Sequence, residues 1–239
     1  MAITSPGAVD YHLAVQSGTL ALNQQGPFTF MSWINSQTWS GTTTNSMVGF
    51  YANATTGGSG LQIGTRAGGT CEAWYWGGTI LVSSSGGTGV TTLTNGVWYH
   101  IAYTFDGTTN RLYINGTQTN TSTVAQLAGT NSTVFINGYP TGGSQETGVF
   151  SAADISVYNR ALSANEILTA YTTAGDKDGL WYGLQTSNPL NEGYPGNTAS
   201  SCVDYTGNGN ILTPIGAATG VNFVYASSPI TSDTRQVQG

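Results

Sequence analysis

The sequence predicts an all-β fold, a sandwich of antiparallel sheets, and three observations lead to this prediction. Residues 98–105 alternate between two faces, one of which is wholly apolar or aromatic, as in a strand that lines a core. The chain holds 34 glycines and 11% aromatic residues, but only 7% charged residues. Turn-forming residues recur along its length. This composition is typical of a rigid β-protein and not of a disordered chain, which combines low hydrophobicity with high net charge.

The other strands are expected where apolar or alternating segments lie between turn residues. Residues 28–34 carry large apolar groups on both faces, so this strand is predicted to be central. At 239 residues, the chain is expected to form one core with extensions. The expected strands are residues 10–15, 28–34, 47–52, 61–65, 71–77, 90–93, 98–105, 111–114, 124–127, 133–138, 149–158, 180–184, the end of 202–212, and 221–225.

The hairpin that begins with residues 98–105 has clear turn signals. Asp106 and Gly107 open the connection to the return strand. Asn115 and Gly116 then offer a second tight turn, because both residue types tolerate positive φ.

One helix is predicted after Ser163. Ser163 and Glu166 have the spacing of a capping box, in which each side chain binds the backbone amide of the other residue. Gly175 is expected to end the helix. The predicted apolar stripe is Ile167, Leu168, Ala170 and Tyr171.

The charge pattern excludes two classes of partner. The net charge is −6 and the five Lys and Arg residues are scattered, whereas a nucleic-acid-binding protein needs a basic stripe. No apolar run approaches the roughly 20 residues that a membrane-spanning helix requires. The first residues lack the features of a signal peptide, so we expect a chain made in the cytosol. A surface so poor in charge suits an assembly better than a free protein.

The two cysteines, Cys71 and Cys202, lie far apart in the sequence. In a chain made in the cytosol, two distant cysteines are more often buried thiols than a disulfide. They also lack the Cys-x-x-Cys spacing that is typical of a metal site.

Three blocks of sequence resemble one known family. Residues 28–34, Phe-Thr-Phe-Met-Ser-Trp-Ile, are similar to its early Phe-Thr-x-x-x-Trp strand. Residues 98–102 and 111–116 are similar to its Trp-x-His-Val-Ala … Leu-Tyr-x-Asp-Gly hairpin, and residues 155–163 to its closing segment. Over residues 8–174 the chain therefore resembles the laminin G-like branch of the concanavalin A-like lectin/glucanase superfamily. The resemblance implies a jelly roll of two packed antiparallel sheets.

The order of the segments departs from that family. Its members usually begin with a strand and an Asp-x-Ser-Gly-Asn-Gly-Asn turn, and a similar passage lies here at residues 180–184 and 204–210. The resemblance therefore implies a circular permutation, in which the C-terminal segment supplies the missing strand to its own sandwich or to a neighbour's. The predicted domain is residues 1–226, with its core at 8–174, completing strands at 179–226 and an extended tail at 227–239.

The sequence predicts no catalytic site. Glycoside hydrolysis needs two carboxylates across one cleft, and the sequence lacks the Glu-x-Asp-x-Glu run of laminarinase-type relatives. Asp176 and Asp178 are two residues apart, but they are expected in a solvated turn. His12 and His100 accompany no nucleophile motif. We therefore expect a protein that is not an enzyme and that requires no cofactor.

Two kinds of ligand remain as predictions. Aromatic rings bind the CH groups of sugars, whereas packing inside the fold and against a neighbour is the alternative for the same rings. The candidate sugar-binding residues are Trp39, Trp74, Tyr75 and Trp76. The candidate calcium ligands are Asp10, Asp154 and Asp204. The family often has two acidic residues before its closing strand. Ala153 and Asp154 occupy those positions here, so one carboxylate of the implied calcium pair is missing.

The sequence leaves two functions open. The first, implied by the resemblance, is a structural protein of a virion, such as a decoration or cement protein on the capsid of a tailed phage. It would bind capsid or other virion proteins and form a homo-oligomer, such as a trimer, by strand addition and apolar burial. Its candidate partner-binding residues are Val221, Phe223, Tyr225 and Ile230. The alternative is a carbohydrate-binding module that recognises glycans on a host surface. Such a module could itself be carried on a phage head or tail fibre, so the two functions can coexist.

Overall fold

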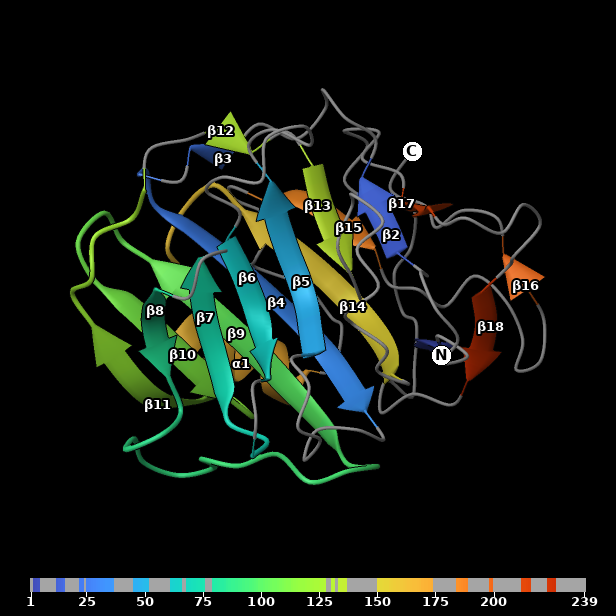
Figure 1. Cartoon of the computed structure of the whole chain (residues 1–239), viewed down its shortest axis with the longest axis horizontal. Coiled ribbons are helices and arrows are strands. Elements are labelled where there is room, and N and C mark those ends of the chain that lie inside the picture. Colours follow the sequence, from blue (N-terminus) through green and yellow to red (C-terminus); the bar gives the residue numbers. More distant parts are fainter. Residues whose placement is uncertain are drawn as a thin grey trace.

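A computed structural model shows a sandwich of two antiparallel sheets with one short helix, which confirms the predicted fold class (Figure 1). The structure describes residues 2–4, 12–15, 22–23, 25–36, 45–51, 61–65, 68–75, 79–127, 130–131, 133–136, 150–173, 184–188, 198–199, 212–215 and 223–226. Side-chain surroundings are described for residues 22–23, 25–36, 61–65, 68–75, 79–127 and 151–173.

The first sheet has nine strands and contains the predicted hairpin at one edge. Its order is β11-β10-β9-β4-β14-β1-β18-β16, and β15 pairs with β14 beside this path. The bounds are Ala2–Thr4 (β1), Phe28–Ser36 (β4), Trp98–Phe105 (β9), Asn110–Ile114 (β10), Thr117–Ser122 (β11), Phe150–Tyr158 (β14), Leu184–Asn188 (β15), Thr198–Ala199 (β16) and Phe223–Ala226 (β18).

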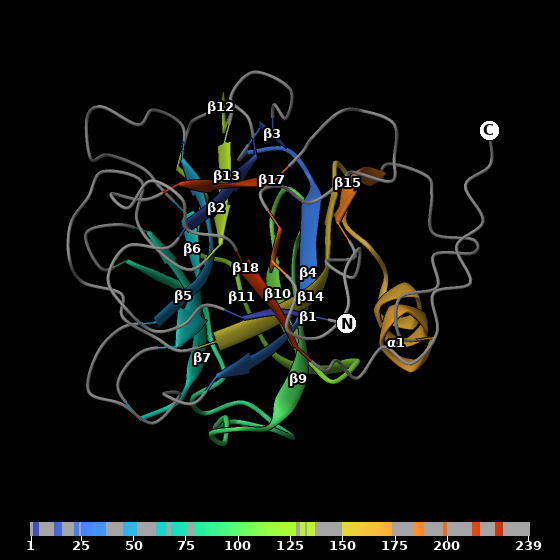
Figure 2. The same ribbon diagram turned by 90° about the vertical axis from the view of Figure 1, so that its right-hand side faces the viewer.

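The second sheet has seven strands in the order β17-β2-β13-β5-β6-β7-β8 and faces the first sheet (Figure 2). The bounds are His12–Val15 (β2), Asn45–Tyr51 (β5), Leu61–Thr65 (β6), Cys71–Tyr75 (β7), Ile80–Ser83 (β8), Thr133–Ile136 (β13) and Leu212–Ile215 (β17). Leu22–Asn23 (β3) and Thr130–Asn131 (β12) form a separate two-stranded ladder.

Strand β4 is central in the first sheet, as its apolar residues on both faces predicted. It pairs with β9 on one side and with β14 on the other. Phe28, Phe30 and Ile34 point into the core between the sheets. Met31 and Trp33 point to the opposite, outer face and are also buried.

The core between the sheets uses the face of β9 that the alternation predicted. Burying a large apolar side chain stabilises the fold by about 1.5–3 kcal/mol, so this face contributes strongly to stability. From β9 the core takes Tyr99, Ile101, Tyr103 and Phe105. From the second sheet it takes Leu61, Ile63, Cys71, Ala73, Tyr75, Leu81 and Val82.

Both predicted turns of the hairpin are confirmed. Gly107 has a φ of 100° in the β9–β10 connection, and Asn115 and Gly116 have φ values of 52° and 75° after β10. These are left-handed conformations that glycine and asparagine adopt at low cost, which is why the chain reverses at these positions.

Helix α1 (Ala164–Thr172) begins with the predicted capping box. The Glu166 amide donates to the Ser163 hydroxyl over 3.3 Å, and the Ser163 amide donates to the Glu166 carboxylate over 2.8 Å. The helix ends at a Thr173 cap, and Gly175 lies outside the described residues. Within the part of the chain that the structure describes, no helix is long and apolar enough to cross a membrane.

Helix α1 packs on the outer face of the first sheet, on the side away from the second sheet (Figure 2). Its Ile167 and Ala170 are buried against residues of the sheet that include Met31 and Tyr158. Leu168 is 45% exposed, so the buried stripe is narrower than the predicted one.

The predicted strands at residues 90–93 and 124–127 are wrong, because both segments lack strand pairing. In the second segment the buried position belongs to Gln126, whose amide binds polar groups in the core, so Val124 and Leu127 are exposed. Strand β8 was not predicted, since its apolar run of three residues is short.

The C-terminal part of the chain adds strands to both sheets. Strand β17 pairs with β2 at the edge of the second sheet, and β18 pairs with β1 in the first. Strand β15, at Leu184–Asn188, pairs with β14 and begins at the last residue of the segment predicted at 180–184, whose residues 180–183 lie outside the described part of the chain. The circular permutation stays a prediction, and the tail at 227–239 is also outside the described part.

Candidate functional site

The predicted sugar-binding residues fall into different environments. Tyr75 is 1% exposed and belongs to the core between the sheets. Trp74 precedes it on β7, points to the outer face of the second sheet and is 4% exposed. Trp39 and Trp76 lie outside the described residues. The burial of Trp74 and Tyr75 agrees with the packing alternative rather than with an open aromatic platform.

Polar residues accompany Trp74 on the outer face of the second sheet. Gln62 lies opposite Trp74 in the β6–β7 register, and Glu72 is two residues away on the same face. The Ser83 hydroxyl donates to the Glu72 carboxylate over 2.9 Å. Gln62 and Glu72 are 1% and 7% exposed, so these groups are packed into the protein together with the indole ring.

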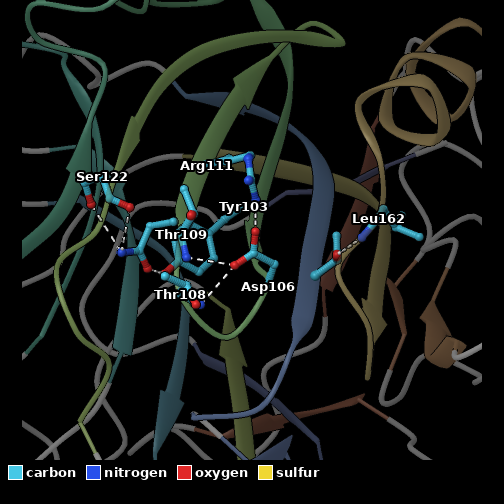
Figure 3. A network of polar contacts seen from close by, with 9 residues as sticks. Tyr103, Asp106, Thr108, Thr109, Arg111, Ser122 and Leu162 are labelled. Carbon is cyan, nitrogen blue, oxygen red and sulfur yellow. Dashed lines mark hydrogen bonds and ion pairs between the residues drawn. The ribbon is translucent and has the colours of Figure 1, made fainter.

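A network of polar side chains lies between the sheets. The Tyr103 hydroxyl donates to the Asn110 side-chain oxygen over 2.6 Å, and the Asn110 amide donates to Ser122 Oγ over 3.2 Å (Figure 3). Gln126 extends the network to the second sheet: its side-chain amide donates to the Tyr103 hydroxyl, and its side-chain oxygen accepts from the Tyr75 hydroxyl. Because each of these polar groups has a partner, the network can be buried without a large penalty.

The β9–β10 connection is fixed by Asp106. Its Oδ1 accepts from the amides of Thr108 and Thr109 over 2.9 and 2.8 Å, and its Oδ2 pairs with Arg111 over 2.6 Å (Figure 3). The hydrogen bond from the Thr109 amide and that from Arg111 lower the pKa of this carboxyl. Asp106 is therefore a turn-stabilising carboxylate.

Of the predicted calcium ligands, Asp154 alone lies within the described residues. It is 2% exposed and has a φ of 51°, at an irregularity of β14 between Ala153 and Ser156. Within the described residues, no group of three His, Cys, Asp or Glu residues could hold a metal ion. Calcium binding stays a prediction that depends on Asp10 and Asp204.

The histidines and cysteines have structural surroundings where they are described. His100 is 1% exposed, and its ring neighbours those of Trp33 and Tyr171, with 5.4 and 6.0 Å between centroids. Cys71 is a free, buried thiol, and burial raises its pKa. Cys202, Asp176 and Asp178 lie outside the described residues.

The predicted partner-binding residues belong to the C-terminal part of the chain. Phe223 and Tyr225 lie on β18, whose backbone pairs with β1 and β16 of the same chain. Val221 and Ile230 lie outside the described residues, so partner binding by this segment stays a prediction.

Four residues that the sequence did not single out as a site form an aromatic group on the outer face of the first sheet. We call Trp33, Trp98, His100 and Tyr171 the Trp33 cluster. The rings of Trp33 and Tyr171 are stacked, with 5.4 Å between centroids and 28° between planes. Trp98 packs against the group formed by Trp33 and Ala153, and both Trp98 and Tyr171 remain partly exposed. Apolar residues on both faces of β4 were the signal that this outer face is covered.

A sandwich of two antiparallel sheets with one helix on an outer face belongs to the class of jelly-roll β-sandwiches. The chain belongs to the concanavalin A-like lectin/glucanases superfamily, because a laminin G-like model of that superfamily matches residues 8–168. This confirms the resemblance seen in the sequence, and nothing in the match indicates a phage origin. A comparison with curated proteins gives no match.

Three solved structures illustrate the similarity of fold. A candidate carbohydrate-binding protein of Bacteroides ovatus has a TM-score of 0.63 and 18% identity, with 90% of this chain and 57% of that chain covered. A heptameric pentraxin of Limulus polyphemus has a TM-score of 0.55 and 20% identity, with 73% of this chain and 82% of that chain covered. The binding domain of botulinum neurotoxin serotype G has a TM-score of 0.51 and 13% identity, with 67% of this chain and 40% of that chain covered. The similarity thus spans about half or less of the length of two of these proteins.

Proposed function

We propose that this protein is a non-catalytic carbohydrate-binding module that recognises glycans on a cell surface, such as that of a host. Its membership of a superfamily of lectins and glucanases supports the proposal. The similarity over 90% of the chain to a candidate carbohydrate-binding protein supports it further.

The arrangement of the described carboxylates is the observation that favours a lectin function over a glucanase function. Glu72 and Asp154 belong to different sheets. Asp106 has a lowered pKa, and hydrogen bonding to Arg160 lowers the pKa of Glu166 to about 2. A glycosidase needs a general acid with a raised pKa beside a second carboxylate, and neither of these two groups meets that requirement.

A glycan array, probed with the full-length protein in the presence of calcium and in the presence of a chelator, tests the proposal. Binding to a defined set of glycans is the expected result. Binding that is lost with the chelator would support the predicted calcium ligands as well. An array without hits in either buffer would refute the carbohydrate-binding function.

A structural role in a virion is a second proposal, supported by the low content of charged residues, 7%. The C-terminal segment would join subunits. Among the described strands, β17 lies at one end of the second sheet and contains Pro214, which has no amide hydrogen to donate to an added strand. We therefore expect subunits to join through another surface. Deleting residues 227–239 and measuring oligomer mass and co-purification with phage particles tests this role. Unchanged assembly would contradict it.

A further inference from the structure

We propose that the sugar binds on the outer face of the first sheet, where Trp98 provides the ring on which a pyranose stacks and Asn35 and Ser151 provide its hydrogen bonds. This inference rests on the proposed carbohydrate-binding function. It locates the binding surface away from Trp74 of the second sheet.

The strand register brings these three residues into one row. Asn35 of β4 lies opposite Trp98 of β9 on one side and opposite Ser151 of β14 on the other. All three are partly exposed. The neighbouring row contains Trp33, which is 8% exposed beneath Tyr171 of α1. The partly exposed row therefore lies beside the last turn of the helix and contains a hydroxyl, an amide and an indole ring in line.

The residues behind this row hold it in place. Trp98 packs against the group formed by Trp33 and Ala153, and Trp33 is in turn stacked on Tyr171. The Asn35 amide donates to the carbonyl of Gly96 over 2.7 Å, and the Gly96 amide donates to the carbonyl of Ser36 over 2.8 Å. Side chains that are already fixed lose little conformational entropy when a ligand binds, which favours affinity for a small ligand such as a sugar.

The chemistry of the row favours an uncharged sugar. Indole, amide and hydroxyl groups carry no charge at neutral pH. An aromatic face with a few fixed polar groups is the usual composition of a small-molecule site, in which the apolar surface supplies contact area and the polar groups set orientation. A pyranose with an apolar CH face matches both parts, whereas an acidic sugar would find no cation in this row.

Titration of Trp98→Ala with the best neutral glycan from the array is the direct test. We expect affinity at least about tenfold weaker, the equivalent of about 1.4 kcal/mol, because the stacking ring is lost. Ser151→Arg adds a bulky, charged side chain to the same partly exposed row and should abolish binding while the core stays intact. Circular dichroism and thermal unfolding show whether each variant folds. If Trp98→Ala fails to fold, Ser151→Arg serves as the test in its place.

The matched control is Trp74→Phe, which alters a buried tryptophan of the second sheet and should leave affinity unchanged. Unchanged binding by folded Trp98→Ala and Ser151→Arg would overturn this location and leave the carbohydrate-binding function standing. Loss of binding in Trp74→Phe alone would place the site on the second sheet and overturn the inference as well. An array without hits refutes the function itself, and this inference with it.

Discussion

The hydroxyl of Tyr75 donates a hydrogen bond to the side-chain oxygen of Gln126 over 2.5 Å. The amide nitrogen of the same Gln126 donates to the Tyr103 hydroxyl over 2.5 Å and to Asn110 Oδ1 over 2.6 Å. Tyr75 belongs to the second sheet and Tyr103 to the first, so one side chain links both sheets across the core. Burial raises the pKa of Tyr75 to about 12 and also raises that of Tyr103, which keeps both hydroxyls protonated.

Replacing Gln126 with Leu should destabilise the fold by about 2–4 kcal/mol, because buried hydroxyl and amide groups would lose their partner. Urea unfolding followed by tryptophan fluorescence measures the change. Gln118→Leu on the exposed edge strand β11 is the control and should have an effect below about 0.5 kcal/mol. Equal effects of the two substitutions would show that the link between the sheets contributes nothing.

The ion pair of Glu166 should make stability depend on pH. Hydrogen bonding to Arg160 lowers the folded-state pKa from 4.5 to about 2. A depressed folded pKa adds stability above the unfolded pKa, and this stability is lost as the pH falls from about 4.5 through about 2. Glu166→Gln should therefore be less stable than the parent at pH 6 and should show a weaker decline over that interval.

Thermal unfolding between pH 2 and pH 6 checks this prediction. Asn165→Gln, at the neighbouring exposed position of α1, should keep the pH dependence of the parent. If Glu166→Gln and the parent decline in parallel, the pair with Arg160 is not the source of the acid sensitivity.

The sequence predicted the elements whose signals are local. Alternation identified β9 and its core face, and the spacing of Ser163 and Glu166 identified the start of α1. It failed at residues 124–127, since only the assembled core shows that Gln126 takes the buried position. Periodicity records which positions are apolar, whereas a polar residue that gains partners from two distant strands leaves no local signal.

The candidate site was harder to predict for a related reason. The aromatic run around Trp74 predicts a sugar-binding surface, yet the exposure of Trp74 depends on what covers the second sheet, and the side chain is buried. The row of Trp98, Asn35 and Ser151 comes from three segments that meet through strand register. No single segment carries that pattern, so the surface becomes visible only after the strands are paired.

The thiol of Cys71 should be unreactive in the folded protein. It is buried and its pKa is raised, and only the thiolate is a good nucleophile. In a Cys202→Ser variant, labelling by a maleimide at pH 8 should proceed only after denaturant is added, as followed by mass spectrometry. Rapid labelling of the native variant would show that β7 opens under native conditions.

Gly116 offers a test of how closely α1 packs on the hairpin. It has a φ of 75°, and a Cβ at this position would lie 3.0 Å from both Leu168 and Tyr171 of the helix. Gly86 has a similar φ of 73°, but a Cβ there would meet nothing within 4 Å. Both alanine variants carry the cost of about 1–2 kcal/mol for a left-handed residue with a side chain.

Gly116→Ala should therefore cost about 1–3 kcal/mol more than Gly86→Ala, because only the former also forces the helix away from the turn. Chemical denaturation of the two variants measures the difference. The displaced helix should also disturb the stack of Tyr171 on Trp33, which near-ultraviolet circular dichroism detects. Equal destabilisation with an unchanged aromatic spectrum would mean that α1 shifts freely over the sheet. The Trp33 cluster would then be too loosely held to support the row at Trp98.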